Sequence, residues 1–183
     1  MTRPTATPTL KTRRLVLRAP GAPGDADRIF ATMQDEEVVR WLARVPWPYE
    51  RHHADGWVAG TADCAASGEE YAFAIDRGGL IGMITLRGDG PEMNTGYWLE
   101  RASWGKGIMT EAAAAVIAFG FNTLGVEAVT SGIFEGNDAS LALQRRLGFT
   151  ETGKSMAHSL YYGRDLRHID TRLTRETYEN RNA

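Results

Sequence analysis

The hydrophobic positions of this chain follow two periods, and together they predict an α+β fold. Apolar residues alternate with polar ones in extended segments at 10–19, 71–76, 80–86, 93–100, 126–133, 149–156 and about 164–173. Helical spacing predicts a short helix from Asp25 and further helices over about 36–42, 51–67, 107–124 and 137–147. This order favours one mixed, mostly antiparallel sheet of about six to seven strands with helices on both faces.

The length of the chain fits one domain. Its 183 residues are enough to bury a single hydrophobic core, and the sequence contains no internal repeat. We expect a flexible lead-in over residues 1–9, a folded domain over 10–175 and a tail over 176–183.

The most informative segment joins the extended segment at 93–100 to the apolar helix at 107–124. It contains Gly105 and Gly107, which tolerate positive φ and let a ligand approach the main chain closely. The helix that follows presents unpaired backbone N–H groups and the positive end of its dipole at the same place. This combination predicts a binding site for a phosphate or pyrophosphate group.

The spacing around the loop separates three kinds of phosphate site. A nucleotide P-loop ends in Gly-Lys-Ser/Thr, whereas Lys106 here stands between two glycines and no earlier glycine has the required spacing. The dinucleotide fingerprint Gly-x-Gly-x-x-Gly fails because Thr110 occupies the third glycine position. The remaining candidate is a coenzyme A loop of the form Gln/Arg-x-x-Gly-x-Gly/Ala at a strand-to-helix junction.

Segments on both sides of the loop extend this match. They are Thr-Arg-Arg-Leu-Val-Leu-Arg at 12–18, Gly-Tyr-Trp-Leu at 96–99, Trp-Gly-Lys-Gly-Ile-Met-Thr-Glu-Ala at 104–112, Asn-Asp-Ala-Ser-Leu at 137–141 and Arg-Leu-Gly-Phe at 146–149. Over roughly residues 10–175 the chain resembles the RimJ/RimL branch of the GNAT N-acetyltransferases. The resemblance implies a single-domain GNAT fold, in which two central strands splay apart and hold the pantetheine arm of acetyl-CoA.

The resemblance also implies which residues hold acetyl-CoA: Leu99, Trp104, Gly105, Lys106, Gly107, Ile108, Met109, Asn137 and Ser140. One side-chain contact departs from the family pattern, because Ala102 occupies the Gln/Arg position of the loop. Asn137 has the alternative role of a helix N-cap. Glu111 favours the dipole of the following helix, and we expect it to face away from the phosphates.

Two catalytic groups are expected to handle protons. The resemblance places Ser140 near the thioester sulfur, where its hydroxyl can hydrogen-bond the departing thiolate; the alternative is a serine on the helix surface. Many relatives carry a tyrosine acid four positions later, but this chain has Gln144. Relatives also carry a glutamate base where this chain has Asn94, which leaves Glu92, on the same strand face, as the candidate base.

The alternative to Glu92 is that no dedicated base exists. This favours an α-amine acceptor, because an α-amine has a pKa near ~8 against ~10.4 for a lysine side chain. The acceptor pocket is expected between the early helices and the late strands. Its candidate residues, each of which has core or loop packing as the alternative, are Trp41, Trp47, Tyr49 and Tyr161.

Composition narrows the class of protein. The net charge of −2 gives no attraction to nucleic acid or to an anionic membrane, and no apolar run is long enough to span a bilayer. Cys64 is the single cysteine, which excludes an intrachain disulfide and suits a reducing cytoplasm. Residues 1–8 lack the apolar core of a signal peptide. The four histidines have no metal-ligand spacing, so we expect no metal site.

We therefore expect a cytoplasmic, acetyl-CoA-dependent N-acetyltransferase. It would move an acetyl group to a primary amine, at a protein N-terminus or on a small molecule, by direct attack in a ternary complex. The resemblance is compatible with a homodimer. One alternative is a non-catalytic acyl-CoA-binding or sensing protein, which Asn94 and Gln144 keep open. Another is a nucleotide-binding module that uses the same helix terminus.

Overall fold

The alternating segments pair into one eight-stranded sheet in a computed structural model that describes residues 3–182. The strand order is β1-β2-β3-β4-β5-β6-β8-β7. The strands are β1 (Leu10–Lys11), β2 (Val16–Arg18), β3 (Glu70–Asp76), β4 (Leu80–Arg87), β5 (Glu92–Leu99), β6 (Ala128–Phe134), β7 (Thr150–Ser159) and β8 (Arg164–Thr174). The helices are α1 (Asp25–Thr32), α2 (Glu36–Val39), α3 (Arg51–Ser67), α4 (Ile108–Phe119), α5 (Asp138–Leu147) and α6 (Arg175–Asn182).

The first expected strand divides into two, which is why the sheet exceeds the six to seven strands expected. Thr12 N–H donates to Leu15 O at 3.0 Å, and this turn lets β2 fold back antiparallel on β1. The helix expected over 107–124 begins with α4 and continues as a π-helical turn, η2 (Gly120–Leu124). A short 3₁₀ turn, η1 (Arg101–Ser103), connects β5 to the glycine loop.

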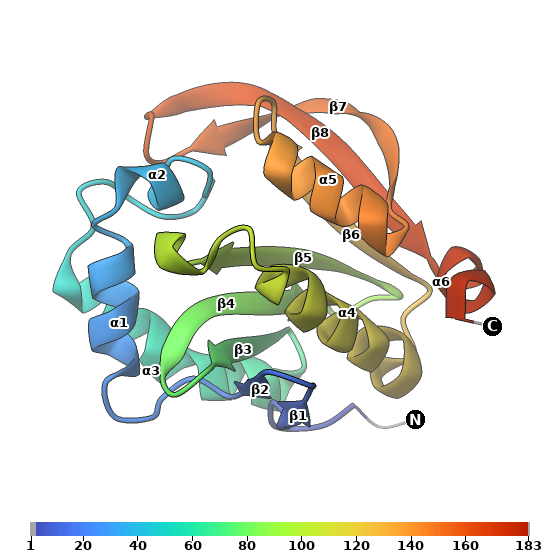
Figure 1. The fold of residues 1–183 in the computed structure, drawn as a ribbon, viewed down its shortest axis with the longest axis horizontal. Coiled ribbons are helices and arrows are strands. Elements are labelled where there is room, and N and C mark those ends of the chain that lie inside the picture. The colour runs from blue at the N-terminus through green and yellow to red at the C-terminus, as the bar shows by residue number, and fades with distance from the viewer. Residues whose placement is uncertain (1–2, 183) are drawn as a thin grey trace.

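Helices cover both faces of the sheet, as the element order predicts. Alternation along β3 places Phe73 in a hydrophobic cluster with α4 and places Ala72 in a second cluster with α1, α2 and α3. Figure 1 shows α4 and α5 on the same side of the sheet, with the start of α4 next to the end of β5. Because α4 packs into the first cluster along most of its length, its apolar sequence lies in the core.

The sheet opens between β5 and β6. These strands pair in parallel only where Glu92–Asn94 meets Ala128–Thr130. Beyond that point β5 stays paired with β4 on one side, and β6 stays paired with β8 on the other. The two halves of the sheet therefore diverge from this short pairing, under α4 and α5 (Figure 1).

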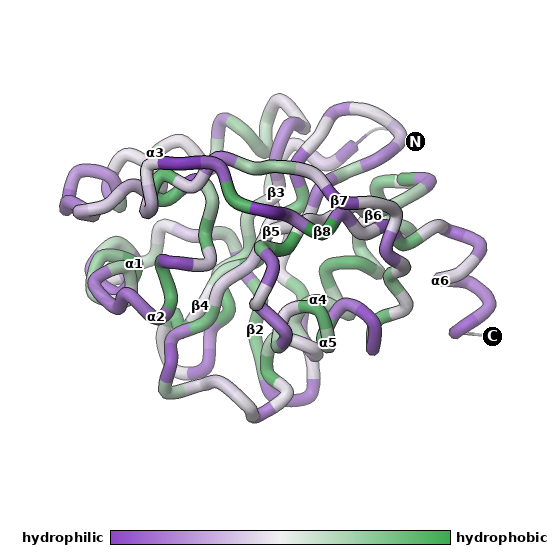
Figure 2. Tube along the Cα trace, turned by 90° about the horizontal axis from the view of Figure 1, so that it is seen from above, coloured by the Kyte–Doolittle hydropathy of each residue, from purple (hydrophilic) through white to green (hydrophobic). Residues whose placement is uncertain are grey.

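The expected tail is a helix. The Tyr178 ring of α6 stacks on Phe121, with centroids 4.5 Å apart and an interplanar angle of 21°. The Arg175 guanidinium donates to the carbonyl oxygens of Phe121 and Val126, at 2.7 Å each. These contacts attach α6 to the end of η2, although most of α6 is hydrophilic (Figure 2).

The N-terminal lead-in also contacts the folded domain, through the Arg3 side chain. The Arg3 guanidinium donates to the carbonyl oxygens of Gly68, Gly88 and Gly90, at 2.7 to 3.2 Å. This segment therefore lies against the loops at the ends of α3 and β4. Met1 and Thr2 of the expected lead-in, and Ala183 of the expected tail, lie outside the described residues.

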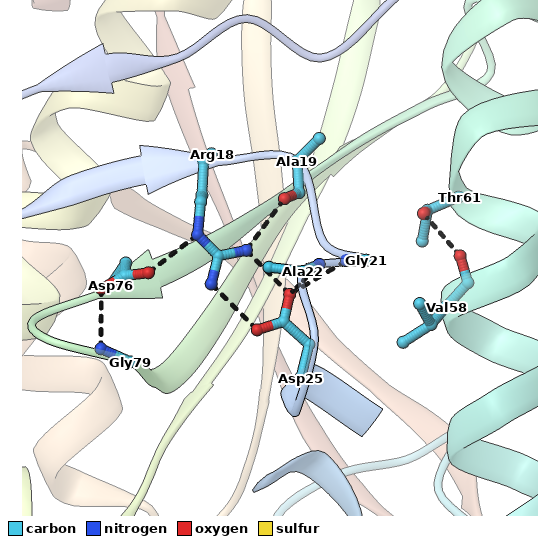
Figure 3. A network of polar contacts seen from close by, with 9 residues as sticks. All are labelled: Arg18, Ala19, Gly21, Ala22, Asp25, Val58, Thr61, Asp76 and Gly79. Atoms are coloured by element: carbon cyan, nitrogen blue, oxygen red, sulfur yellow. Dashed lines mark hydrogen bonds and ion pairs between the residues drawn. The ribbon is translucent and has the colours of Figure 1, made fainter. Parts of the chain in front are cut away.

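A buried ion pair connects the first strands to α1 (Figure 3). The Arg18 guanidinium donates two hydrogen bonds to Asp25, at 2.7 and 2.9 Å, and one to Asp76 at 2.8 Å. Asp25 also accepts from the backbone N–H groups of Gly21 and Ala22. Burial alone raises the pKa of Asp25, but these hydrogen bonds outweigh it and lower the pKa below its usual value.

Replacing Asp25 with Asn should destabilise the fold by about 3 kcal/mol at pH 7, because it removes the buried carboxylate and leaves the partly buried Arg18 with Asp76 as its charge partner. Since the pKa of Asp25 is lowered in the folded state, its contribution is complete above its unfolded pKa of about 3.9 and is lost as the pH falls through the folded-state value. The difference between Asp25→Asn and wild type should therefore shrink below about pH 4. Urea unfolding at pH 7 and pH 3 measures both effects.

The matched control is Asp27→Asn. Asp27 lies in the same helical turn and pairs with Arg51, but its side chain is 66% exposed. An exposed pair contributes less than about 1 kcal/mol. Equal losses for Asp25→Asn and Asp27→Asn would contradict a special role for the buried pair.

Candidate functional site

The divergence of β5 and β6 opens a cleft of about 1360 Å³. The cleft is lined on one side by the glycine loop, the start of α4 and α5, and on the other by α3 and the loop after α2. Trp41 reaches across from that loop toward Gly136, where a Cβ would lie 3.6 Å from the indole ring. The cleft is therefore continuous from the phosphate-type loop to the opposite face of the sheet.

Side chains replace the backbone ladder where β5 and β6 separate. The last backbone pair joins Asn94 and Thr130. One residue further along, Ser131 Oγ donates to Thr95 O at 2.9 Å. Gln144 of α5 is 1% exposed, and its Nε2 donates to Ser131 Oγ at 2.8 Å. A buried polar network thus connects both strands to α5 just where their pairing ends.

The proton positions in this network follow from what each group can donate. Ser131 Oγ gives its single proton to Thr95 O, so it accepts from Gln144 Nε2. The other proton of Gln144 Nε2 goes to the Tyr97 hydroxyl at 3.1 Å. The Thr171 hydroxyl on β8 lies within hydrogen-bond distance of both Gln144 Oε1 and Ser131 O, so it contacts the amide from the side opposite Ser131 Oγ.

The Tyr97 hydroxyl connects this hydrogen-bond network to Ser140. Because the Tyr97 hydroxyl accepts from Gln144, its own proton is available for Ser140 Oγ, 2.7 Å away. Burial raises the pKa of Tyr97, so the phenol stays protonated at neutral pH. With Tyr97 as the donor in this pair, the proton of Ser140 is left for a group in the cleft.

The glycine loop has the geometry of an anion site. Gly105 and Gly107 have φ of 71° and 68°, and no described atom lies within 4 Å of a Cβ placed at Gly105. Glu111 N–H donates to Gly107 O at 3.2 Å and closes the first turn of α4, so the N–H groups before it in that turn have no intrahelical acceptor. Open main chain, N–H donors and the helix dipole fit a pyrophosphate.

The loop is braced from the first hairpin. Arg14 donates to Lys106 O at 3.0 Å and pairs with Glu111 at 2.6 Å. Hydrogen bonds from Thr12 and Arg14 lower the pKa of Glu111 to about 2. Glu111 is outside the cleft lining, and its carboxylate is held by Thr12 and Arg14 of the first hairpin.

Most of the expected cofactor residues meet in the cleft. Its lining includes Leu99, Trp104, Gly105, Gly107, Ile108, Met109, Asn137 and Ser140. Lys106 is outside this lining, and its ammonium donates to Ala102 O at 2.7 Å. Asn137 is the N-cap of α5, since its Oδ1 accepts from Ser140 N–H at 3.2 Å.

Of the four residues expected in the acceptor pocket, two line the cleft and two do not. Trp41 and Tyr49 line the cleft. Trp47 and Tyr161 lie outside the lining and pack edge to face, with centroids 5.5 Å apart. The Tyr161 hydroxyl donates to Glu36, which raises the pKa of Tyr161 to about 12. These two rings therefore support the wall of the pocket rather than forming its surface.

The structure does not bring Glu92 together with Ser140. Glu92 lies outside the cleft lining, beside the short β5–β6 pairing, and forms an ion pair with Arg172 at 2.7 Å. The hydrogen bond from Arg172 lowers the pKa of Glu92, so this carboxylate is a poor proton acceptor. The Asn94 amide donates to Thr130 Oγ1 at 3.4 Å.

Sequence reasoning missed two residues of the cleft. Tyr97 belongs to the Gly-Tyr-Trp-Leu segment, but only the fold places its hydroxyl against α5. His168 on β8 also lines the cleft, and Asp170, two residues further, holds its ring at 3.1 Å. The sequence does contain one indication of this pair: His168 and Asp170 are two residues apart on a predicted strand, which places both side chains on one face.

Two wider searches concern the described residues only. No group of three or more His, Cys, Asp or Glu side chains within residues 3–182 is arranged to hold a metal ion. No helix in the same range has the length and apolar character needed to cross a membrane.

Comparisons with known proteins identify the family of this chain. Residues 14–150 match the acetyltransferase (GNAT) domain family. A Bacillus subtilis (strain 168) protein named "Putative ribosomal N-acetyltransferase YdaF" is 30% identical over 158 residues, covering 76% of this chain and 85% of that protein.

Solved structures share the fold. RimJ of Mycobacterium smegmatis, in complex with CoA-disulfide, superposes with a TM-score of 0.79 at 21% identity and covers 96% of this chain and 91% of that one. The microcin C7 self immunity acetyltransferase MccE, in complex with acetyl-CoA and AMP, gives 0.77 at 16% identity, with coverages of 89% and 93%. The family match contains the strand, loop and helices that build the cleft, and this chain therefore belongs to the GNAT acetyltransferase family.

Proposed function

We propose that this protein transfers the acetyl group of acetyl-CoA to a primary amine, either the α-amine of a peptide or a small-molecule amine, in a ternary complex. The observation that carries the proposal is the hydrogen-bond chain from Gln144 through Tyr97 to Ser140, which ends in a cleft that begins at an anion site. The complexes of RimJ with CoA-disulfide and of MccE with acetyl-CoA support the choice of cofactor.

The residues present fit acetyl-CoA. The N–H groups of the loop and of the first turn of α4 would hold its pyrophosphate, with Arg14 beside Gly107. Asn137 uses its Oδ1 atom for the helix cap, so its amide protons remain for the pantetheine arm. When bound, acetyl-CoA supplies an activated acyl group as a thioester.

Ser140 is placed to protonate the leaving sulfur. Its Oγ lies 2.7 Å from the Tyr97 hydroxyl, and when Tyr97 is the donor in this pair the Ser140 proton can point at the sulfur. Gln144 stands where many relatives have a tyrosine acid, and here it orients a phenol that comes from β5. The chain thus keeps a tyrosine beside the leaving group, although not on α5.

The acceptor amine would enter from the other face of the sheet. On that face the two diverging strands carry Gly96 and Gly132, each two residues beyond the last backbone pair. Gly96 leaves its side of the opening without a side chain, whereas the space above Gly132 is taken by the His168 ring. Trp41 and Tyr49 line this side of the cleft and offer flat surfaces to the substituent of the amine.

Replacing Gly107 with Asp should abolish acetyl-CoA binding, because it adds a carboxylate at the anion site and a side chain where φ is positive. Thermal unfolding with and without acetyl-CoA measures this. Wild type should gain about 2.7 kcal/mol with ligand at ~100 times Kd. Gly163→Asp is the control, since Gly163 has a similar φ of 61° in the β7–β8 turn. Unchanged affinity in Gly107→Asp would remove the loop from the binding site.

Replacing Ser140 with Ala should lower kcat by about 10²-fold, the lower end of the range for general acid catalysis, with little change in acetyl-CoA affinity. The assay follows thiol release with a panel of N-terminal peptides and small amines. Ser67→Ala, at the exposed end of α3, is the control. Full activity of Ser140→Ala would make this serine structural. A wild type that binds acetyl-CoA but acetylates no amine would favour the non-catalytic alternative.

Replacing Tyr97 with Phe should lower kcat in the same direction but less, because Ser140 keeps its own proton. If the two hydroxyls act in series, the double variant Tyr97→Phe, Ser140→Ala should be no slower than Ser140→Ala alone. Steady-state kinetics of the four proteins in this cycle test the coupling. Additive losses would show that the two side chains act independently.

A further inference from the structure

We propose that His168 is the general base of the reaction and accepts the proton of the acceptor amine, with Asp170 as the residue that positions its ring. This inference rests on the proposed function, since it concerns the amine side of the same cleft. It assigns the base that neither Asn94 nor Glu92 supplies.

The imidazole of His168 lies over a glycine. A Cβ at Gly132 would be 1.6 Å from His168 Cε1 and 2.4 Å from its Nε2 atom, so only glycine leaves room for the ring. Phe134 packs against the ring edge to face, with centroids 5.5 Å apart. The His168 side chain is 18% exposed and lines the cleft. Its location is therefore fixed, and it is in contact with the cleft.

The protonation of the ring follows from its partner. His168 Nδ1 lies 3.1 Å from Asp170 Oδ1, and a carboxylate only accepts hydrogen bonds, so Nδ1 carries a proton. Ser155 Oγ donates to the same oxygen at 2.9 Å and helps to hold Asp170 in place. Nε2 has no hydrogen-bond partner among the described residues, so in the neutral ring its lone pair is available.

His168 faces the amine side of the opening. Ser131 and Gly132 are consecutive on β6, so they address opposite faces of the sheet. Ser131 belongs to the hydrogen-bond network that ends at Ser140, whereas the His168 ring lies over Gly132 on the other face. The proton donor for the sulfur and the proton acceptor for the amine therefore lie on opposite faces of the same gap.

A second histidine of the cleft does not have this property. His53 Nδ1 accepts from the backbone N–H of Glu50 at 3.0 Å. In the neutral ring the proton of His53 is then on Nε2, which leaves no nitrogen lone pair for an amine.

The step balances as follows. The lone pair of the neutral amine forms the N–C bond while the C–S bond of the thioester breaks and its electrons leave with sulfur. One amine proton passes to His168 Nε2, and the sulfur takes the proton of Ser140. His168 later releases its proton to solvent, and Ser140 regains one proton from solvent in the open cleft, so the enzyme ends with the protons it began with. The products are an amide and a thiol.

The first test needs no cofactor. Long-range ¹H–¹⁵N NMR of the protein alone reports which nitrogen of each neutral histidine carries the proton. We expect the Nδ1–H tautomer for His168, and its loss in Asp170→Asn, whose amide can donate to Nδ1. An Nε2–H tautomer for wild-type His168 would overturn the inference, because that nitrogen could not accept a proton.

The second test uses the amine panel described for Ser140. His168→Ala should lower kcat by 10²-fold or more with acetyl-CoA affinity unchanged, and added imidazole should restore part of the rate. Gly132→Ala should lower kcat similarly, since its Cβ displaces the ring without removing it. His158→Ala is the matched control, because His158 pairs with Asp165 at 2.8 Å on the same hairpin but outside the cleft lining.

The outcomes separate this inference from the proposed function. An active wild type with an equally active His168→Ala overturns the inference and leaves the function standing. A slow His168→Ala that imidazole does not rescue, and that also loses acetyl-CoA affinity, makes His168 a packing residue. A wild type that acetylates no amine contradicts the proposed function itself, and the role of His168 with it.

Discussion

The structure depends on a parallel strand pair that stops after three residues. Two strands that separate inside a domain expose backbone groups that must find other partners. Here Ser131 supplies a hydroxyl to Thr95 O at the next position, and Gln144 satisfies Ser131 from α5. The backbone carbonyl of Thr95 thus keeps a partner where the strands separate, although the buried Thr95 hydroxyl has no hydrogen-bond partner. The width of the opening is set by side chains of fixed length, which is what a cleft for an extended cofactor arm requires.

The same network directs protons. A buried network has a direction when its members have a fixed count of protons, and the Ser131–Thr95 bond fixes that count here. Gln144 cannot act as an acid, yet it donates to the Tyr97 hydroxyl and holds it next to Ser140. Structure and chemistry are thus carried by one set of residues, so a substitution at Gln144 affects both the spacing of the strands and the orientation of Ser140.

The amino-acid pattern predicted the sheet, the helices on both faces and the glycine loop, because these depend on local periodicity and on glycine at positive φ. It did not predict that residues 10–19 form a hairpin, since a turn at Thr12 has no glycine or proline to mark it. It missed α6, whose composition is hydrophilic and whose attachment comes from Tyr178 and Arg175 meeting η2.

The sequence predicted the site residues that lie together in one local motif. It did not predict the residues that only the fold brings together from distant segments. The loop residues and Ser140 lie in local motifs, and most of them line the cleft. Tyr97 meets Ser140 across 43 residues, and His168 lies over Gly132 because β8 inserts between β6 and β7. Glu92 looked available in the sequence because its partner, Arg172, is 80 residues away.

The imidazole above Gly132 makes positions 132 and 168 dependent on each other in evolution. A lineage that first exchanges His168 for a small residue can then accept a side chain at 132 without a clash. The reverse order passes through a protein in which a Cβ and the ring compete for one space. Once 132 has a side chain, a histidine at 168 cannot place its ring where it lies now, so the order of the two substitutions matters.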